Sequence, residues 1–103
     1  MSDIVSTDDA LHAMGLGERE RPEMDDVVRA VNALMVRYKG DHSEWPEYWR
    51  QGARMLATRI YRRRDSPAGV EAMGELGPVY VQRNDPDLAQ LLELGRYARP
   101  MVG

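Results

Sequence analysis

Residues 22–40 read PEMDDVVRAVNALMVRYKG, and the spacing of their apolar side chains sets the expected architecture. Pro22 is tolerated in the first turn of a helix, and the acidic residues after it complement the positive end of the helix dipole. Seven apolar residues then recur at intervals of three and four: Met24, Val27, Val28, Val31, Leu34, Met35 and Tyr38. This spacing predicts a helix from Pro22 to Lys39 with one buried face, which Gly40 ends.

A longer helix is predicted from Trp45 to Arg64. Ser43 is placed to cap it. Its apolar positions continue the helical period up to a run of arginines: Trp45, Trp49, Ala53, Leu56 and Ile60. Gly52 and Ala53 are small enough for a neighbouring helix to approach closely, although glycine costs about 1 kcal/mol relative to alanine. At roughly 30 Å, this helix is expected to span the whole domain.

Shorter helices are predicted near both ends of the chain. Ser6 and Asp9 have the spacing of a capping box, which predicts a helix from Thr7 to Met14. Residues 15–21 hold two glycines and four charged side chains and are expected to form a linker. Residues 84–87, NDPD, indicate the start of a last helix that contains three leucines and ends at Gly95.

Between the long helix and the last one, the helical pattern breaks at residues 65–69. Residues 70–73 and 79–82 then predict the two arms of a short β-hairpin, which is marginal in water without further packing. The expected fold is therefore mainly α: a small bundle of three to four helices with a short β-hairpin or extended loop before the last helix. Residues 1–21 form its N-terminal helix and linker, and residues 22–103 form the helical domain with its tail.

Composition limits the function classes. At 103 residues the chain has room for one domain with a modest core. A net charge of −3 disfavours a general nucleic-acid binder. The absence of cysteine excludes disulfides and thiolate ligands and fits a reducing cytoplasm. No apolar run approaches the ~20 residues that a membrane helix needs, and the first residues lack the order of a signal peptide.

The histidines offer no catalytic base. His12 lies in the short first helix, and His42 lies in a polar turn. A metal site around His42 with Asp41 and Glu44 lacks further ligands that zinc requires, so a solvated turn histidine is favoured. A phosphate-binding glycine loop lies between a strand and a helix. Gly15 and Gly17 instead follow a predicted helix, so they do not form such a loop. The sequence therefore predicts neither an enzyme nor a cofactor or metal. An enzyme would need a concave polar pocket that no motif indicates.

Four arginines gather at the end of the long helix: Arg59, Arg62, Arg63 and Arg64. Guanidinium groups pair with phosphate in two-pronged fashion, so one hypothesis is a small DNA-binding regulator that uses residues 45–64 as its recognition helix. Cations at a helix C-terminus also complement its dipole, and adjacent residues point around the helix, which favours a structural role. If these arginines also have a function, the favoured one is an inter-subunit salt bridge.

Trp45 and Trp49, one turn apart, are open to two interpretations. Tryptophan is enriched at interface hot spots. Because the chain has no phenylalanine, the core also needs their bulk, and the core interpretation is favoured.

From residue 22 to residue 103 the order of elements resembles the head-to-tail connector family of tailed bacteriophages, also called portal adaptors or head-completion proteins. The resemblance consists of the acidic-started helix at 22–39, the longer helix with a basic end at 45–64, and residues 66–103, SPAGVEAMGELGPVYVQRNDPDLAQLLELGRYARPMVG. Its last part, from Asp85 through LLELGRYARPMVG, is similar to the short helix and arginine-proline tail that close such proteins.

This resemblance implies a structural virion protein at the head–tail interface, assembled in the host cytoplasm. Copies would form a homo-oligomeric ring, commonly of twelve subunits in that family, beneath the portal protein. The ring would seal and extend the channel, through which genomic DNA passes without sequence-specific binding, and would offer the surface to which tail-completion or stopper proteins attach. No cofactor, enzymatic activity or membrane contact is implied.

The resemblance also implies roles for two regions. Four residues are candidates to face the channel or a neighbouring subunit: Glu71, Met73, Glu75 and Leu76. Six residues of the tail are candidates to bind the portal: Arg96, Tyr97, Arg99, Pro100, Met101 and Val102. Carboxylates repeated around a channel repel phosphate and would let DNA slide during ejection.

Overall fold

Helices form all the regular structure of residues 3–98, the part of the chain that the computed structural model describes, with the side chain of Glu75 left out. Their order within this range is α1 (Thr7–Met14), η1 (Glu18–Glu20), α2 (Arg21–Lys39), α3 (Glu47–Arg62), α4 (Pro67–Glu75), α5 (Pro78–Asn84), α6 (Pro86–Leu91) and η2 (Gly95–Tyr97). The predicted mainly α class is confirmed.

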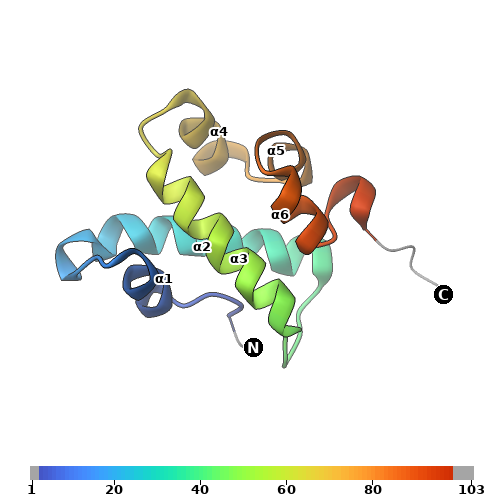
Figure 1. Cartoon of the computed structure of the whole chain (residues 1–103), viewed down its shortest axis with the longest axis horizontal. Helices are drawn as coiled ribbons and strands as arrows, with labels where there is room; N and C mark the ends of the chain where they lie inside the picture. The colour runs from blue at the N-terminus through green and yellow to red at the C-terminus, as the bar shows by residue number, and fades with distance from the viewer. Residues whose placement is uncertain (1–2, 99–103) are drawn as a thin grey trace.

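The two long helices, α2 and α3, cross at the centre of the molecule (Figure 1). Six members of the predicted stripe on α2 are buried: Met24, Val27, Val28, Val31, Leu34 and Met35. The seventh, Tyr38, is 45% exposed. Helix α3 buries one broad face, against which α1, α2 and α6 all pack. It therefore forms the centre of the core. At 16 residues, or about 24 Å, α3 is shorter than predicted and does not span the 46 Å long axis of the molecule.

Helix α3 begins later than expected. Its N-cap is Pro46, without a side-chain cap, so the prediction that Ser43 caps this helix was wrong. Proline disfavours helical conformation in the residue before it, which keeps Trp45 outside the helix. The helix also ends at Arg62, two residues before the predicted end.

The N-terminal helix α1 has the predicted bounds. The backbone N–H of Asp9 donates to Oγ of Ser6 at 3.1 Å, and Gly15 closes the helix with a left-handed φ of 68°. The segment before α1 is tied to α2, because the Asn32 side chain exchanges two hydrogen bonds with the backbone of Val5. The predicted linker at 15–21 contains the short turn η1 and the first residue of α2.

The predicted β-hairpin was wrong. Residues 70–73 lie in α4, and residues 79–82 lie in α5. Oγ of Ser66 caps α4 by accepting from the N–H of Gly69 at 3.2 Å, and Pro67 occupies the first turn. Pro78 starts α5 in the same way after an extended Gly77. Because proline at a first helical position has a suitable φ and needs no hydrogen bond, both Pro signals favour helix over strand.

The last α-helix, α6, packs across the middle of α3. As predicted, it starts after Asp85 with Pro86, but it ends at Leu91, before Gly95. A Cβ atom on Gly52 would lie 3.0 Å from Cδ2 of both Leu91 and Leu92. The prediction that a small residue here admits a neighbouring helix is therefore confirmed.

Candidate interaction surfaces

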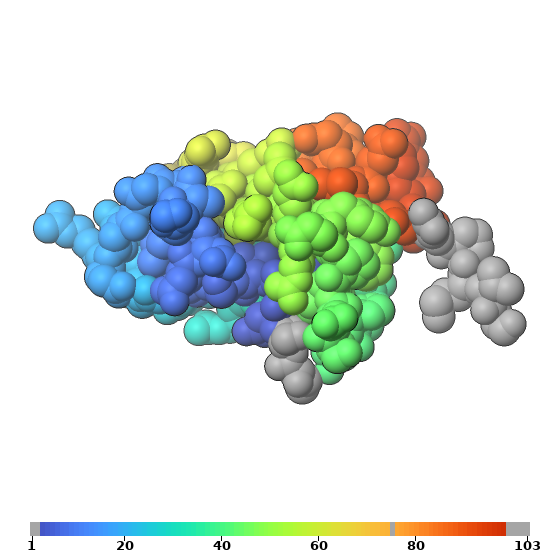
Figure 2. Space-filling view, turned by 60° about the horizontal axis from the view of Figure 1, so that its bottom comes forward, coloured from blue at the N-terminus to red at the C-terminus, as the bar shows by residue number. Residues whose placement is uncertain are grey.

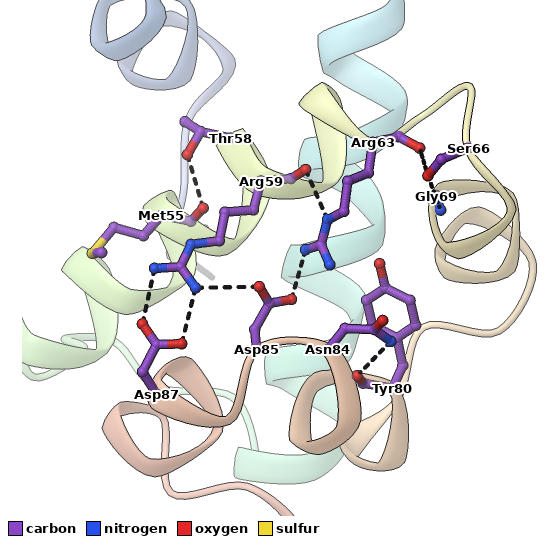
Figure 3. A network of polar contacts seen from close by, with 10 residues as sticks. All are labelled: Met55, Thr58, Arg59, Arg63, Ser66, Gly69, Tyr80, Asn84, Asp85 and Asp87. Carbon is purple, nitrogen blue, oxygen red and sulfur yellow. Dashed lines mark hydrogen bonds and ion pairs between the residues drawn. The ribbon is translucent and has the colours of Figure 1, made fainter.

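A polar network joins the end of α3 to the start of α6 (Figure 3). The Arg59 guanidinium donates to both oxygens of Asp87, at 2.9 and 2.8 Å, and also to Oδ1 of Asp85 at 3.2 Å. Nη2 of Arg63 donates to the other Asp85 oxygen at 2.6 Å. Asp85 is 3% exposed, so its carboxylate is a buried acceptor shared by two arginines. The network fixes the short helices against the long one.

The protonation equilibria reflect these contacts. The hydrogen bond with Asp87 raises the pKa of Arg59, against the opposing effect of burial. The same hydrogen bond lowers the pKa of Asp87. Tyr80 lies beneath Arg63, whose guanidinium carbon is 5.6 Å from the ring centroid, and burial raises the pKa of its hydroxyl. The pKa shifts of Arg59 and Asp87 both favour the charged forms that their ion pair requires.

The arginine run serves mainly this intramolecular purpose. Arg59 and Arg63 pair with Asp85, and Arg64 pairs with Glu23 of α2 at 2.8 Å. Arg62 is exposed and makes no ion pair with any residue between 3 and 98. The helix-end interpretation also fits, since side-chain nitrogens of Arg63 and Arg64 donate to the carbonyls of Arg59 and Tyr61. An inter-subunit salt bridge stays a prediction, with Arg62 as its most available donor.

The tryptophans and His42 pack together at the start of α3. Trp45 is buried, which confirms the core interpretation for that residue, and Trp49 is half-buried. The His42 ring lies 4.8 Å from the Trp45 ring and 5.6 Å from the Trp49 ring, and its Nε2 is 2.8 Å from the Lys39 carbonyl. The predicted solvated histidine is therefore a half-buried one. Nowhere in residues 3–98 do three potential metal ligands gather.

A shallow groove lies between α2 and the pair α4–α5. It consists of two adjoining hollows of about 190 and 520 Å³, which share Arg37, Gly74 and Leu76. The smaller one extends along α2, and the larger one is lined by Tyr38 and by the start of α5. We call these two hollows the α2–α5 groove. Five large apolar side chains on the same three helices are exposed: Val36, Tyr38, Val70, Met73 and Val79.

Three of the four residues predicted to face a channel or neighbour lie at this groove. Met73 and Leu76 line it. Glu71 also lines it and forms an ion pair with Arg83. The side chain of Glu75 is outside the described part. The sequence did not predict that Arg37, Tyr38 and Val79 line a common groove. Arg37 and Tyr38 belong to the helix predicted at 22–39, and Val79 belongs to a predicted strand.

The predicted portal-binding tail is described only in part. Arg96 is exposed, donates to the Tyr97 hydroxyl at 2.8 Å and stacks on that ring. The backbone N–H of Arg96 donates to Oε1 of Gln82, which ties η2 to α5. Four of the six predicted residues lie outside the described range: Arg99, Pro100, Met101 and Val102.

Comparison with known proteins adds no assignment. No family model, curated protein or solved structure matches this chain. None of the helices between residues 3 and 98 combines the length and apolarity needed to cross a bilayer. The functional proposal therefore depends on the residues and surfaces described above.

Proposed function

We propose that this chain is a structural head-to-tail adaptor of a tailed bacteriophage. Copies of it form a ring beneath the portal that extends and seals the DNA channel and carries the tail attachment surface. The observation that supports this most is the α2–α5 groove with its exposed apolar side chains. The sequence resemblance of residues 22–103 to head-to-tail connectors supplies the identity of the assembly.

The groove supports an assembly because apolar surface of this kind is costly to leave in water. Three of the large exposed apolar side chains line the groove, namely Tyr38, Met73 and Val79, and Val79 is 74% exposed. Contiguous apolar patches rimmed by polar groups mark protein interfaces. A contact between one such face and a different face of the next copy closes into a ring when its rotation permits.

The ion-pair network around Asp85 suits a structural subunit of an assembly. The buried carboxylate of Asp85 holds Arg59 of α3 and Arg63 at its C-cap, so the short helices keep a defined position relative to the long ones. A rigid subunit loses less conformational entropy on assembly than a flexible one. The same network argues against α3 as a DNA recognition helix, because three of its four clustered arginines pair with carboxylates of this chain.

Immunogold labelling of purified virions tests the proposal directly. We expect label at the vertex where head and tail join, and a ring in electron micrographs when the purified chain is mixed with portal protein. Label absent from particles, together with salt-sensitive binding to short duplex DNA, would contradict the adaptor and favour the regulator. The salt dependence is diagnostic because phosphate contacts release counterions.

A further inference from the structure

The charges of this chain are distributed unevenly along it. Residues 3–26 contain eight acidic and two basic side chains, whereas residues 27–103 contain nine acidic and twelve basic ones. Helix α2 shows the same asymmetry within its own length, with Glu23, Asp25 and Asp26 near its start and Arg37 and Lys39 at its end. Opposite charges thus occupy opposite ends of one long helix.

This sequence asymmetry is also a spatial one. Helix α2 runs along the long axis of the molecule, which extends 46 Å (Figure 1). The segment around η1 and the start of α2, in blue, projects from one end of the molecule, and the C-terminal helices, in orange and red, occupy the other (Figure 2). We call residues 17–20, with η1, the acidic knob. Its tip carries Glu18, Arg19 and Glu20.

The α2–α5 groove lies near the basic end of α2. Arg37 lines both of its hollows, is exposed, and has no ion pair within residues 3–98; its guanidinium carbon lies 5.5 Å from the Tyr38 ring centroid. The other cation beside the groove, Arg83, already pairs with Glu71. The groove therefore offers apolar surface and one uncompensated positive charge.

We propose that the α2–α5 groove of one copy receives the acidic knob of the next copy. This inference rests on the proposed ring and names its subunit contact. The groove contributes apolar surface from Tyr38, Leu76 and Val79. Arg37 attracts the carboxylate of Glu20, because Glu18 is already paired with Arg21 at 2.6 Å. Because knob and groove are different surfaces of the same chain, the contact is heterologous and each copy can bind two neighbours.

A neighbour is required because the two surfaces cannot meet within one chain. Arg19 precedes α2, and Val79 lines the hollow beside Tyr38 at the other end of that helix. The helix between them spans roughly 25 Å at ~1.5 Å per residue. That is far beyond the ~7 Å between Cα atoms that a disulfide tolerates.

Disulfide trapping tests the contact cleanly, because the natural chain has no cysteine. The double variant Arg19→Cys with Val79→Cys, purified at full length and oxidised, should yield a ladder of covalent multimers. Mixing the two single variants should yield only dimers that contain one chain of each kind. A matched control places the second cysteine at Gln51, an exposed residue of α3 outside the groove, and should give no ladder.

Charge exchange tests the electrostatic part. Arg37→Glu in the Val79→Cys chain should lower the dimer yield at least about tenfold, since like charges at a contact cost several kcal/mol. Glu20→Arg in the Arg19→Cys chain should restore it. Arg29→Glu, at an exposed arginine of α2 outside the groove, should leave the dimer yield unchanged. Thermal melting must show each variant folded, because Glu20 accepts a hydrogen bond from the Gly17 N–H.

The outcomes separate this inference from the proposed function. Groove-to-groove dimers of Val79→Cys alone, or no cross-linked product from folded variants, would overturn the knob-and-groove contact. The adaptor proposal would survive that result if the natural chain still labelled the head–tail vertex. A ladder from a chain absent from virions would support the contact and end the adaptor proposal.

Discussion

The pair α2–α3 and the three short helices α4, α5 and α6 are stabilised by different physical means. Helices α2 and α3 are 19 and 16 residues long and bury a periodic apolar face. Helices α4, α5 and α6 have nine, seven and six residues. Isolated helices shorter than ~12 residues are marginal in water, so the short ones depend on tertiary contacts.

Two contacts in particular connect the short helices to the long pair. One is the buried carboxylate of Asp85, which binds Arg59 and Arg63. The other is the close approach of α6 to Gly52. The comparison shows that, in a small helical domain, periodic burial suffices for long helices, whereas short helices need specific anchors at defined residues. It also predicts that the two regions respond differently to substitution.

Removal of the buried carboxylate should have the largest effect. Asp85→Ala leaves Arg59 and Arg63 without their shared partner and should lower the free energy of unfolding by about 3 kcal/mol. Urea denaturation measures this, and hydrogen exchange should show faster exchange in α5 and α6 than in α2. Asp87→Ala is the matched control, because its side chain is 60% exposed and its ion pair contributes about 0.5 kcal/mol. Equal losses in both variants would contradict the distinction.

Filling the space beside α6 should have an intermediate effect. Gly52→Val places methyl groups where Leu91 and Leu92 lie and should cost about 1–3 kcal/mol through overpacking. Adding Leu91→Ala should relieve part of the overpacking. The loss of unfolding free energy in the double variant should therefore be smaller than the sum of the losses in the two single variants. Gln51→Val, at the exposed neighbouring position, should change stability by less than about 0.5 kcal/mol. If the losses of unfolding free energy from Gly52→Val and Leu91→Ala simply added, the close contact between Gly52 and Leu91 would be contradicted.

Acidification should have the smallest effect. The hydrogen bond from Arg59 places the pKa of Asp87 in the folded chain below its ordinary 3.8. The stabilisation is therefore present above about pH 4 and is lost as the pH falls through the folded-state pKa. Because Asp87 is largely exposed, the loss should not exceed about 0.5 kcal/mol. Comparing urea midpoints of the natural chain and Asp87→Asn between pH 5 and pH 2 measures it, and identical pH dependence would count against the contact.

The features predicted correctly from sequence are local ones. The bounds of α1 follow from Ser6 and Gly15, and the buried face of α2 follows from a spacing that repeats every turn. The β-hairpin was wrong because Val70, Val79 and Val81 favour strand, while Ser66-Pro67 was interpreted as a break and the helix-start signal of Pro78 was overlooked. Both kinds of signal were present, and the stronger one was misread.

The candidate site was less predictable. Arg59 was singled out, but its partners Asp85 and Asp87 are 26 and 28 residues away in sequence, and no local pattern links them. Of the residues that line the groove, the sequence analysis predicted only Glu71, Met73 and Leu76 as surface contacts. Its opposite wall, which includes Arg37 and Tyr38, comes from a helix whose exposed side the periodicity does not describe.

What the sequence by itself determined is the set of long helices, their buried faces, the caps of α1 and the opposite charges at the two ends of α2. Each of these depends on residues within a few turns of one another, so spacing alone specifies them. Only the tertiary structure decided which arginines pair with Asp85, how closely α6 approaches Gly52 and where α2 and α5 enclose a groove. Those features arise where distant segments cross, and the crossing geometry is a property of the packed core as a whole.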